Sequence, residues 1–234
     1  MTTQTQQASN IRPLKIALET GAPVSGLYVE AVRPFACCAL APGAGAGMTH
    51  SFMTRVADGL AKRRINTLLY QFPFMEAGAK RPDGPAVAHA AVRGAVAAAA
   101  ETSGDLPLFA GGKSFGGRMT SQAQALMPLS GVRGLVFFGF PLHPANKPAS
   151  ARALHLADVR VPMMFAQGTR DALADATLMR GVIAGLSAET TLYEIADGDH
   201  AMHVPKRGGR SDHEVLDDAL DAVAAWMARV ASAT

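Results

Sequence analysis

The chain has 234 residues, of which 49% are hydrophobic and 18% charged, with 22 lysines and arginines against 19 aspartates and glutamates. That length fits one domain with a large core, and the composition excludes a disordered or highly charged protein. The formal charge of +3 comes without a dense basic block, so no nucleic-acid partner is expected. The longest apolar runs are far shorter than a membrane span, so no membrane partner is expected either.

The first ten residues and the two cysteines bear on where the protein is located. Residues 1–10 are polar and carry no basic region followed by an apolar one, so we expect a disordered tail rather than a secretory signal, with one domain over 11–234. Cys37 and Cys38 are neighbours in an apolar run and would point to opposite faces of a strand, which disfavours a disulfide. A cytoplasmic protein is the simplest prediction.

The first half of the chain alternates apolar runs with glycine and proline punctuation and with helical spacing. Residues 14–19 and 26–32 are predicted to form a hairpin around Gly21-Ala22-Pro23. Further strands are predicted at 35–40 and 65–72, with a helix over 48–64 between them. Asp83 is the expected cap of an alanine-rich helix that runs to about Glu101.

The second half keeps the same rhythm. The expected strands are 107–111, 132–140, 159–167 and 190–195, and the expected helices are 115–127, a short one at about 149–156, 175–186 and 215–230. Strands and helices that alternate in this way predict a doubly wound, mostly parallel sheet with helices on both faces.

A serine between glycines stands at one of these strand-to-helix junctions. Gly112-Lys113-Ser114-Phe115-Gly116 is a G-x-S-x-G motif, preceded by the strand at 107–111 and followed by the helix at 115–127. This flanking context gives the motif its meaning, because it places the serine hydroxyl on a sharp, exposed turn. Ser114 is therefore the candidate nucleophile.

A serine nucleophile needs a base and an acid, and both follow strand ends further along the chain. Asp171 comes after the strand at 159–167, and His200 after the strand at 190–195, in the order acid then base. Asp175 is the rival acid but is better placed to cap the following helix, and His203 is the rival base. The carboxyl ends of parallel strands share one edge, where ligands bind.

An acyl-transfer site also needs donors for the oxyanion. We predict the backbone N–H groups of Phe115, directly after the nucleophile, and of Ala44, in the glycine-rich loop at 43–47. A phosphate-binding loop is the alternative, but its motifs would require glycine where Met48 stands and, for the P-loop, lysine at Thr49. The nucleotide interpretation is weak.

The motifs together resemble the α/β-hydrolase superfamily. They are Gly43-Ala44-Gly45-Ala46-Gly47-Met48, Gly111-Gly112-Lys113-Ser114-Phe115-Gly116-Gly117-Arg118, Gly139-Phe140-Pro141-Leu142-His143-Pro144, Gln167-Gly168-Thr169-Arg170-Asp171 and Asp199-His200. More narrowly, the chain resembles the dienelactone-hydrolase-like group that includes testis-expressed protein 30 and regulatory subunit 3 of the NSL complex. The resemblance implies an eight-stranded sheet, a Ser-Asp-His triad and esterase-like chemistry. Pro42 departs from the histidine that relatives commonly carry there.

The predicted function is that of a serine hydrolase acting on a small ester, with no metal and no cofactor. The alternative is a non-catalytic protein-interaction module that keeps the fold. Three prolines in the segment 141–158 leave room for only one short helix, which predicts no large lid and an open site for short substrates. Met48, His143 and Met202 are the expected pocket residues. A homodimer is a possible assembly.

Overall fold

The computed structural model describes residues 10–233, except for the side chain of Arg207. Of the tail predicted at 1–10, only Asn10 lies within these residues, and it begins the first strand. Within the described residues, eight strands form one sheet in the order β1-β2-β4-β3-β5-β6-β7-β8. The strands are β1 (Asn10–Ile16), β2 (Val24–Glu30), β3 (Ala36–Ala41), β4 (Ile65–Tyr70), β5 (Leu108–Lys113), β6 (Val132–Phe138), β7 (Met163–Gly168) and β8 (Thr190–Ile195).

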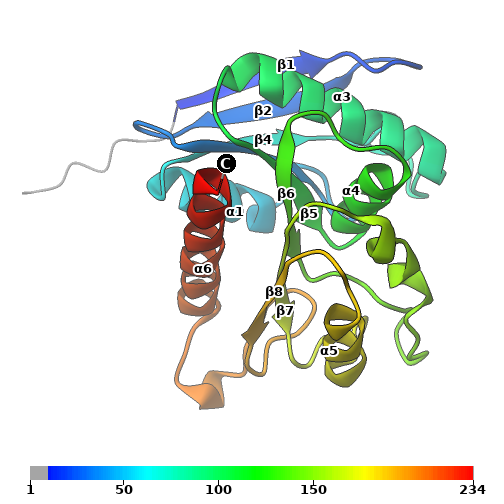
Figure 1. Cartoon of the computed structure of the whole chain (residues 1–234), viewed down its shortest axis with the longest axis vertical. Coiled ribbons are helices and arrows are strands. Elements are labelled where there is room, and N and C mark those ends of the chain that lie inside the picture. Colours follow the sequence, from blue (N-terminus) through cyan, green and yellow to red (C-terminus); the bar gives the residue numbers. More distant parts are fainter. Residues whose placement is uncertain (1–9, 234) are drawn as a thin grey trace, which may run out of the picture.

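The sheet is antiparallel at one end and parallel over the rest. The predicted hairpin joins β1 and β2, which are antiparallel and pair from Asn10 with Glu30 to Ile16 with Val24. The β2–β4 pair is also antiparallel, and every pair from β4 to β8 is parallel. The predicted mostly parallel, doubly wound sheet is confirmed (Figure 1).

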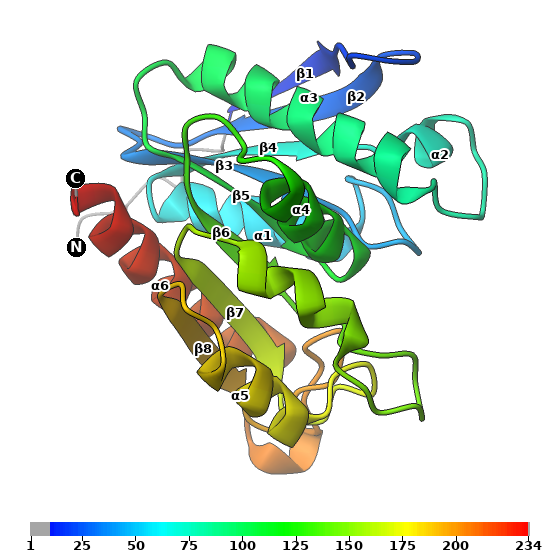
Figure 2. The same cartoon turned by 45° about the vertical axis from the view of Figure 1, so that its right-hand side comes forward.

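Helices cover both faces of the sheet (Figure 2). On one face lie α3 (Pro85–Ser103), α4 (Phe115–Leu126), the 3-10 helix η1 (Ala151–Asp158) and α5 (Ala176–Ala184). On the other face lie α1 (Ser51–Lys62) and α6 (Asp212–Ser232). Two short elements complete the description, the helix α2 (Pro73–Glu76) and the 3-10 turn η2 (Lys206–Gly208).

Each face of the sheet has its own apolar core. All six residues of β3 are buried, because its side chains point alternately into the two cores. Cys37 packs into the core under α3 and α4, while Cys38 packs into the core under α1 and α6. Both thiols are free, as the opposite orientation of neighbours in a strand requires.

Helix α6 is stabilised by a buried apolar stripe and by a cap at its N-terminus. The apolar stripe of this helix is buried: Leu216, Leu220, Val223, Trp226 and Met227. Ser211 and Glu214 form a reciprocal capping box at its start.

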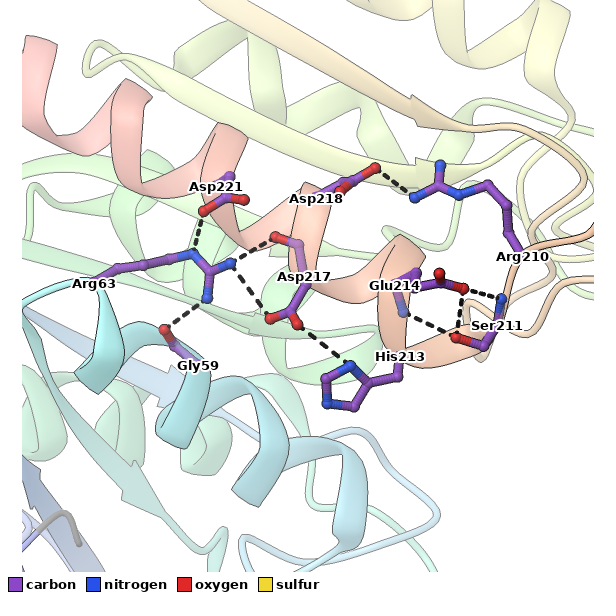
Figure 3. A network of polar contacts seen from close by, with 9 residues as sticks. All are labelled: Gly59, Arg63, Arg210, Ser211, His213, Glu214, Asp217, Asp218 and Asp221. Carbon is purple, nitrogen blue, oxygen red and sulfur yellow. Dashed lines mark hydrogen bonds and ion pairs between the residues drawn. The ribbon is translucent and has the colours of Figure 1, made fainter. Parts of the chain in front are cut away.

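A polar bridge ties α6 to α1 on the solvent side of these two helices (Figure 3). Arg63, at the end of α1, donates from Nε to Asp221 Oδ1 at 2.6 Å and from Nη2 to the Asp217 carbonyl at 2.9 Å. Its Nη1 donates to the Gly59 carbonyl within α1 at 3.0 Å. Since the Arg63 side chain is only 16% exposed, these bonds lie partly out of water and fix the angle between the two helices.

Two predictions about elements are wrong, and one element was missed. Gly84, not Asp83, is the N-cap of α3, because Pro85 takes the first helical position and the Asp83 carboxylate instead accepts from Phe74 N at 2.8 Å. The strand predicted to begin at Val159 begins at Met163, because Val159 still closes η1. The short helix α2 was not predicted.

The segment between β6 and β7 contains only η1, so no large lid stands over the sheet edge. Among the described residues, no helix is long and apolar enough to cross a membrane.

Candidate active site

Ser114 lies on the tight turn between β5 and α4, as its motif predicts. Its backbone has φ 50° and ψ −114°, a left-handed conformation that non-glycine residues rarely adopt. The Ser114 N–H donates to the Phe138 carbonyl at 3.1 Å, which anchors the turn to β6. The strained turn holds the hydroxyl at the edge of the sheet.

Two glycines of the motif are required because the backbone passes close to the end of β3. A Cβ atom on Gly112 would lie 2.4 Å from the Ala41 carbonyl oxygen, and one on Gly116 would lie 2.5 Å from the Pro42 carbonyl oxygen. Neither backbone oxygen can move without shifting β3 or the residue directly after it. Small residues therefore allow the nucleophile turn to sit against the loop that carries Ala44.

The structure brings Ser114, His200 and Asp171 into one hydrogen-bonded chain. His200 Nε2 lies 2.8 Å from Ser114 Oγ, and His200 Nδ1 lies 2.7 Å from Asp171 Oδ2. The Asp171 side chain is fully buried, whereas the His200 side chain is 27% exposed. This is the order of contacts that lets an imidazole accept a hydroxyl proton while a carboxylate orients its ring.

Neighbouring groups hold Asp171 in place. Gln167 Nε2 donates to Asp171 Oδ2 at 2.6 Å, and Leu173 N donates to Asp171 Oδ1 at 2.7 Å. The buried Gln167 also accepts from Phe140 N at 2.8 Å through its Oε1. The carboxylate is thus fully hydrogen-bonded, as a buried charge must be.

The rival acid and base lie elsewhere. Asp175 caps α5, where its side chain accepts from Leu178 N at 2.9 Å. His203 is an exposed residue whose Nδ1 lies 2.8 Å from Asp212 Oδ2, and this contact raises its pKa. Asp171 and His200, not these alternatives, are the residues that the structure brings together with Ser114.

A cavity of about 440 Å³ opens at Ser114 and His200. It is lined by the loop at 43–47, by the start of α1, and by residues around Ser114 and His200. The lining residues are Gly43, Ala44, Gly45, Ala46, His50, Phe52, Met53, Arg55, Lys113, Ser114, His200 and Ala201. Ala44, a predicted oxyanion donor, lies in this lining. Phe115, the other predicted donor, is the first residue of α4, and its ring packs edge-on against Phe72 with centroids 5.2 Å apart.

The three predicted pocket residues do not line this cavity. Met48 and Met202 are buried in the core under α1 and α6. His143 is 3% exposed and has both ring nitrogens engaged, Nδ1 at 2.9 Å from the Pro144 carbonyl and Nε2 accepting from Asp175 N at 3.0 Å. Sequence position near a strand end did not reveal which way these side chains point.

Three polar residues of the cavity were not predicted. His50 and Arg55 lie at the start of α1, where His50 Nδ1 accepts from Phe52 N at 3.2 Å as the helix cap. Lys113 stands inside the G-x-S-x-G motif itself, and its Nζ lies over the Phe52 ring at 5.3 Å. Burial lowers the pKa of Lys113 to about 8, although Asp171 and Asp199 oppose that shift. The motif position was the available signal for Lys113.

No group of three or more histidine, cysteine, aspartate or glutamate side chains is arranged to hold a metal ion anywhere within 10–233.

The Alpha/beta hydrolase domain model matches residues 35–228, most of the chain. The chain belongs to the α/β-hydrolase family. The sheet order, the nucleophile turn and the Ser-His-Asp contacts of this α/β-hydrolase agree with that assignment. The narrower resemblance to testis-expressed protein 30 stays a prediction.

Solved structures share the fold at low sequence identity. A dienelactone hydrolase from Anabaena variabilis has a TM-score of 0.71 and 17% identity, with 95% of this chain and 97% of that chain covered. An α/β serine hydrolase without a lid from Xanthomonas campestris has a TM-score of 0.67 and 18% identity, with 92% and 93% covered. A cold-adapted esterase from an Arctic intertidal metagenomic library has a TM-score of 0.68 and 16% identity, with 94% and 95% covered.

Proposed function

We propose that this α/β-hydrolase is a serine esterase that cleaves small esters through an acyl-enzyme on Ser114. The observation that carries the proposal is the continuous chain of contacts from Ser114 Oγ to His200 Nε2 at 2.8 Å and from His200 Nδ1 to Asp171 Oδ2 at 2.7 Å. The names of structural neighbours, an esterase and a dienelactone hydrolase among them, support the same chemistry.

In the proposed cycle, His200 takes the Ser114 proton as the hydroxyl attacks the ester carbonyl, and then gives it to the leaving alcohol. Asp171 stabilises the imidazolium that forms between these steps. The Phe115 and Ala44 N–H groups would bind the oxyanion, and the α4 N-terminus adds a favourable dipole. Water then cleaves the acyl-enzyme by the same route in reverse. These steps require neither a metal nor an organic cofactor.

The test is covalent labelling of the intact protein by a fluorophosphonate probe, followed by peptide mapping. We expect labelling at Ser114 and its loss in Ser114→Ala. Ser121→Ala is the matched control, because Ser121 Oγ also lies 2.7 Å from a histidine nitrogen, Nε2 of His155. Ser121 is buried, and among the described residues no carboxylate bonds to His155, so that pair is not expected to react.

Absence of labelling and of ester turnover in the folded wild-type protein would contradict the proposal. The alternative, a protein-interaction module without catalysis, would then be the better explanation of the fold. Labelling that persists in Ser114→Ala would contradict the assignment of the nucleophile.

A further inference from the structure

Lys113 is the one ammonium group among the described residues that lines the cavity at Ser114. It is the last residue of β5, so its backbone is fixed by the sheet next to the nucleophile. Its side chain runs between the Phe52 ring and the loop after β8, where Nζ donates a hydrogen bond to the backbone carbonyl of His200. Lys113 thus precedes Ser114 in the sequence, and its side chain binds His200, the residue that contacts the Ser114 hydroxyl.

The end of β6 leaves the room for this ammonium group. Gly139 has φ +64°, and a Cβ atom there would lie 2.5 Å from Lys113 Nζ and 3.2 Å from the His200 carbonyl oxygen. A side chain at this position would have to displace either the amine or the histidine loop. Gly139 thus leaves space where Lys113 and His200 meet.

We propose that Lys113 is a positioning residue of the proposed hydrolase, which fixes the loop of His200 through its carbonyl and so aims Nε2 at Ser114. The Ser114–His200 contact depends on this loop because β8 ends at Ile195, five residues before the histidine. The Asp199 carboxylate braces the same loop by accepting from Ala201 N and His203 N at 2.7 and 2.9 Å. Lys113 adds a hydrogen bond to the backbone of His200 itself.

The charge of Lys113 gives this role a pH dependence. The groups that face Nζ are Asp171 after β7, Asp199 and the His200 carbonyl after β8, and the Phe52 ring of α1. Because the pKa of Lys113 lies at about 8, the ammonium loses its proton as the pH rises through that value. A neutral amine is a weaker donor than an ammonium group, so the hold on His200 weakens on the alkaline side.

The proposal rests on the proposed serine-hydrolase function, so the first measurement compares ester turnover by the wild type and Ser114→Ala. If the wild type turns over esters and Ser114→Ala does not, the serine-hydrolase function stands. The role of Lys113 is then tested separately from it. Lys113→Met is expected to lower kcat ~10- to 100-fold with KM little changed, the cost of a misplaced catalytic group. Lys62→Met is the matched control, an exposed lysine of α1 outside the site, and is expected to behave as the wild type.

Two further variants separate positioning from a general structural role. Lys113→Arg keeps a charged donor and is expected to recover much of kcat, without the activity loss near pH 8 that is expected of the wild type. Gly139→Ala pushes Nζ away without removing it and is expected to lower kcat as Lys113→Met does, which also covers the case in which the methionine variant does not fold. Melting temperatures check that each variant is folded.

Combination with His200→Ala gives the deciding readout. Because Lys113 is proposed to act through the imidazole, adding Lys113→Met to His200→Ala is expected to change the residual turnover less than twofold. The proposal is overturned if Lys113→Met matches Lys62→Met, if its effect lies in KM alone, if Lys113→Arg is as slow as Lys113→Met, or if the full loss persists in the His200→Ala background.

Discussion

Gln167 donates a 2.6 Å hydrogen bond to Asp171 Oδ2, the same carboxylate oxygen that contacts His200 Nδ1. The amide cannot turn away, because its Oε1 accepts from Phe140 N at 2.8 Å and the side chain is buried. The carboxylate is thus fixed from both β7 and the segment after β6. Gln167, three contacts away from Ser114 through Asp171 and His200, therefore sets the direction of the proposed acid.

Gln167→Leu removes this support and is expected to lower the kcat of ester turnover ~10- to 100-fold, because the carboxylate that orients His200 loses one of its donors. The orphaned Phe140 N–H is expected to cost about 1–3 kcal/mol of stability as well. Steady-state kinetics and urea unfolding measure the two effects. Gln122→Leu, which removes a bond from α4 to His89 of α3, is the control and is expected to leave kcat unchanged.

The proposed base and acid are expected to differ in their effects. His200→Ala is expected to be as damaging as Ser114→Ala, on the order of 10⁴-fold or more in kcat, because nucleophile and base act as one unit. Asp171→Asn is expected to be less damaging. Esterase rates of these variants and of His203→Ala provide the check. An inactive His203→Ala beside an active His200→Ala would contradict the choice of base.

The absence of a large lid predicts a preference for short acyl chains. The cavity of about 440 Å³ is bounded by α1 and the loop at 43–47, and the only helix between β6 and β7 is η1. Nothing in that segment encloses a long chain, so kcat/KM is expected to fall along p-nitrophenyl acetate, butyrate, octanoate and palmitate. A rise toward palmitate would contradict the prediction.

His155 is expected to make the folded state less stable in mild acid. Burial, helped by the nearby charge of Arg118, lowers its pKa from 6.5 to about 4. The unfolded chain therefore binds the proton first, and stability is lost as the pH falls from about 6.5 toward 4. His155→Gln removes this titration and is expected to flatten the decline of Tm between pH 6.5 and 4. A decline as steep in His155→Gln as in the wild type would contradict this prediction.

The bridge between α1 and α6 predicts a difference between two arginines (Figure 3). Arg63→Ala removes bonds to Asp221, Asp217 and Gly59 from a side chain that is mostly out of water, and is expected to cost about 1–3 kcal/mol in unfolding free energy. Arg210→Ala removes an ion pair with Asp218 that is about half exposed, and is expected to cost less than ~1 kcal/mol. Equal losses in urea unfolding would contradict this interpretation.

The sequence by itself determined the alternation of strands and helices and the three residues at their junctions. Hydrophobic periodicity and glycine punctuation act over a few residues, so they can be read locally. Parallel strands place their carboxyl ends on one edge, and this rule alone puts Ser114, Asp171 and His200 near one another. Element ends were less certain, because a single residue such as Pro85 or Val159 decides where a helix begins or ends.

Only the tertiary structure decided the directions of the side chains around that edge. His143 and Met202 follow strand ends as His200 does, yet both are buried, whereas His50 and Arg55 of α1 line the cavity. The physical reason is that burial and rotamer depend on packing between elements far apart in the chain. No local pattern records that Lys113, on β5, meets the carbonyl of His200, 87 residues later, in the space left by a glycine after β6.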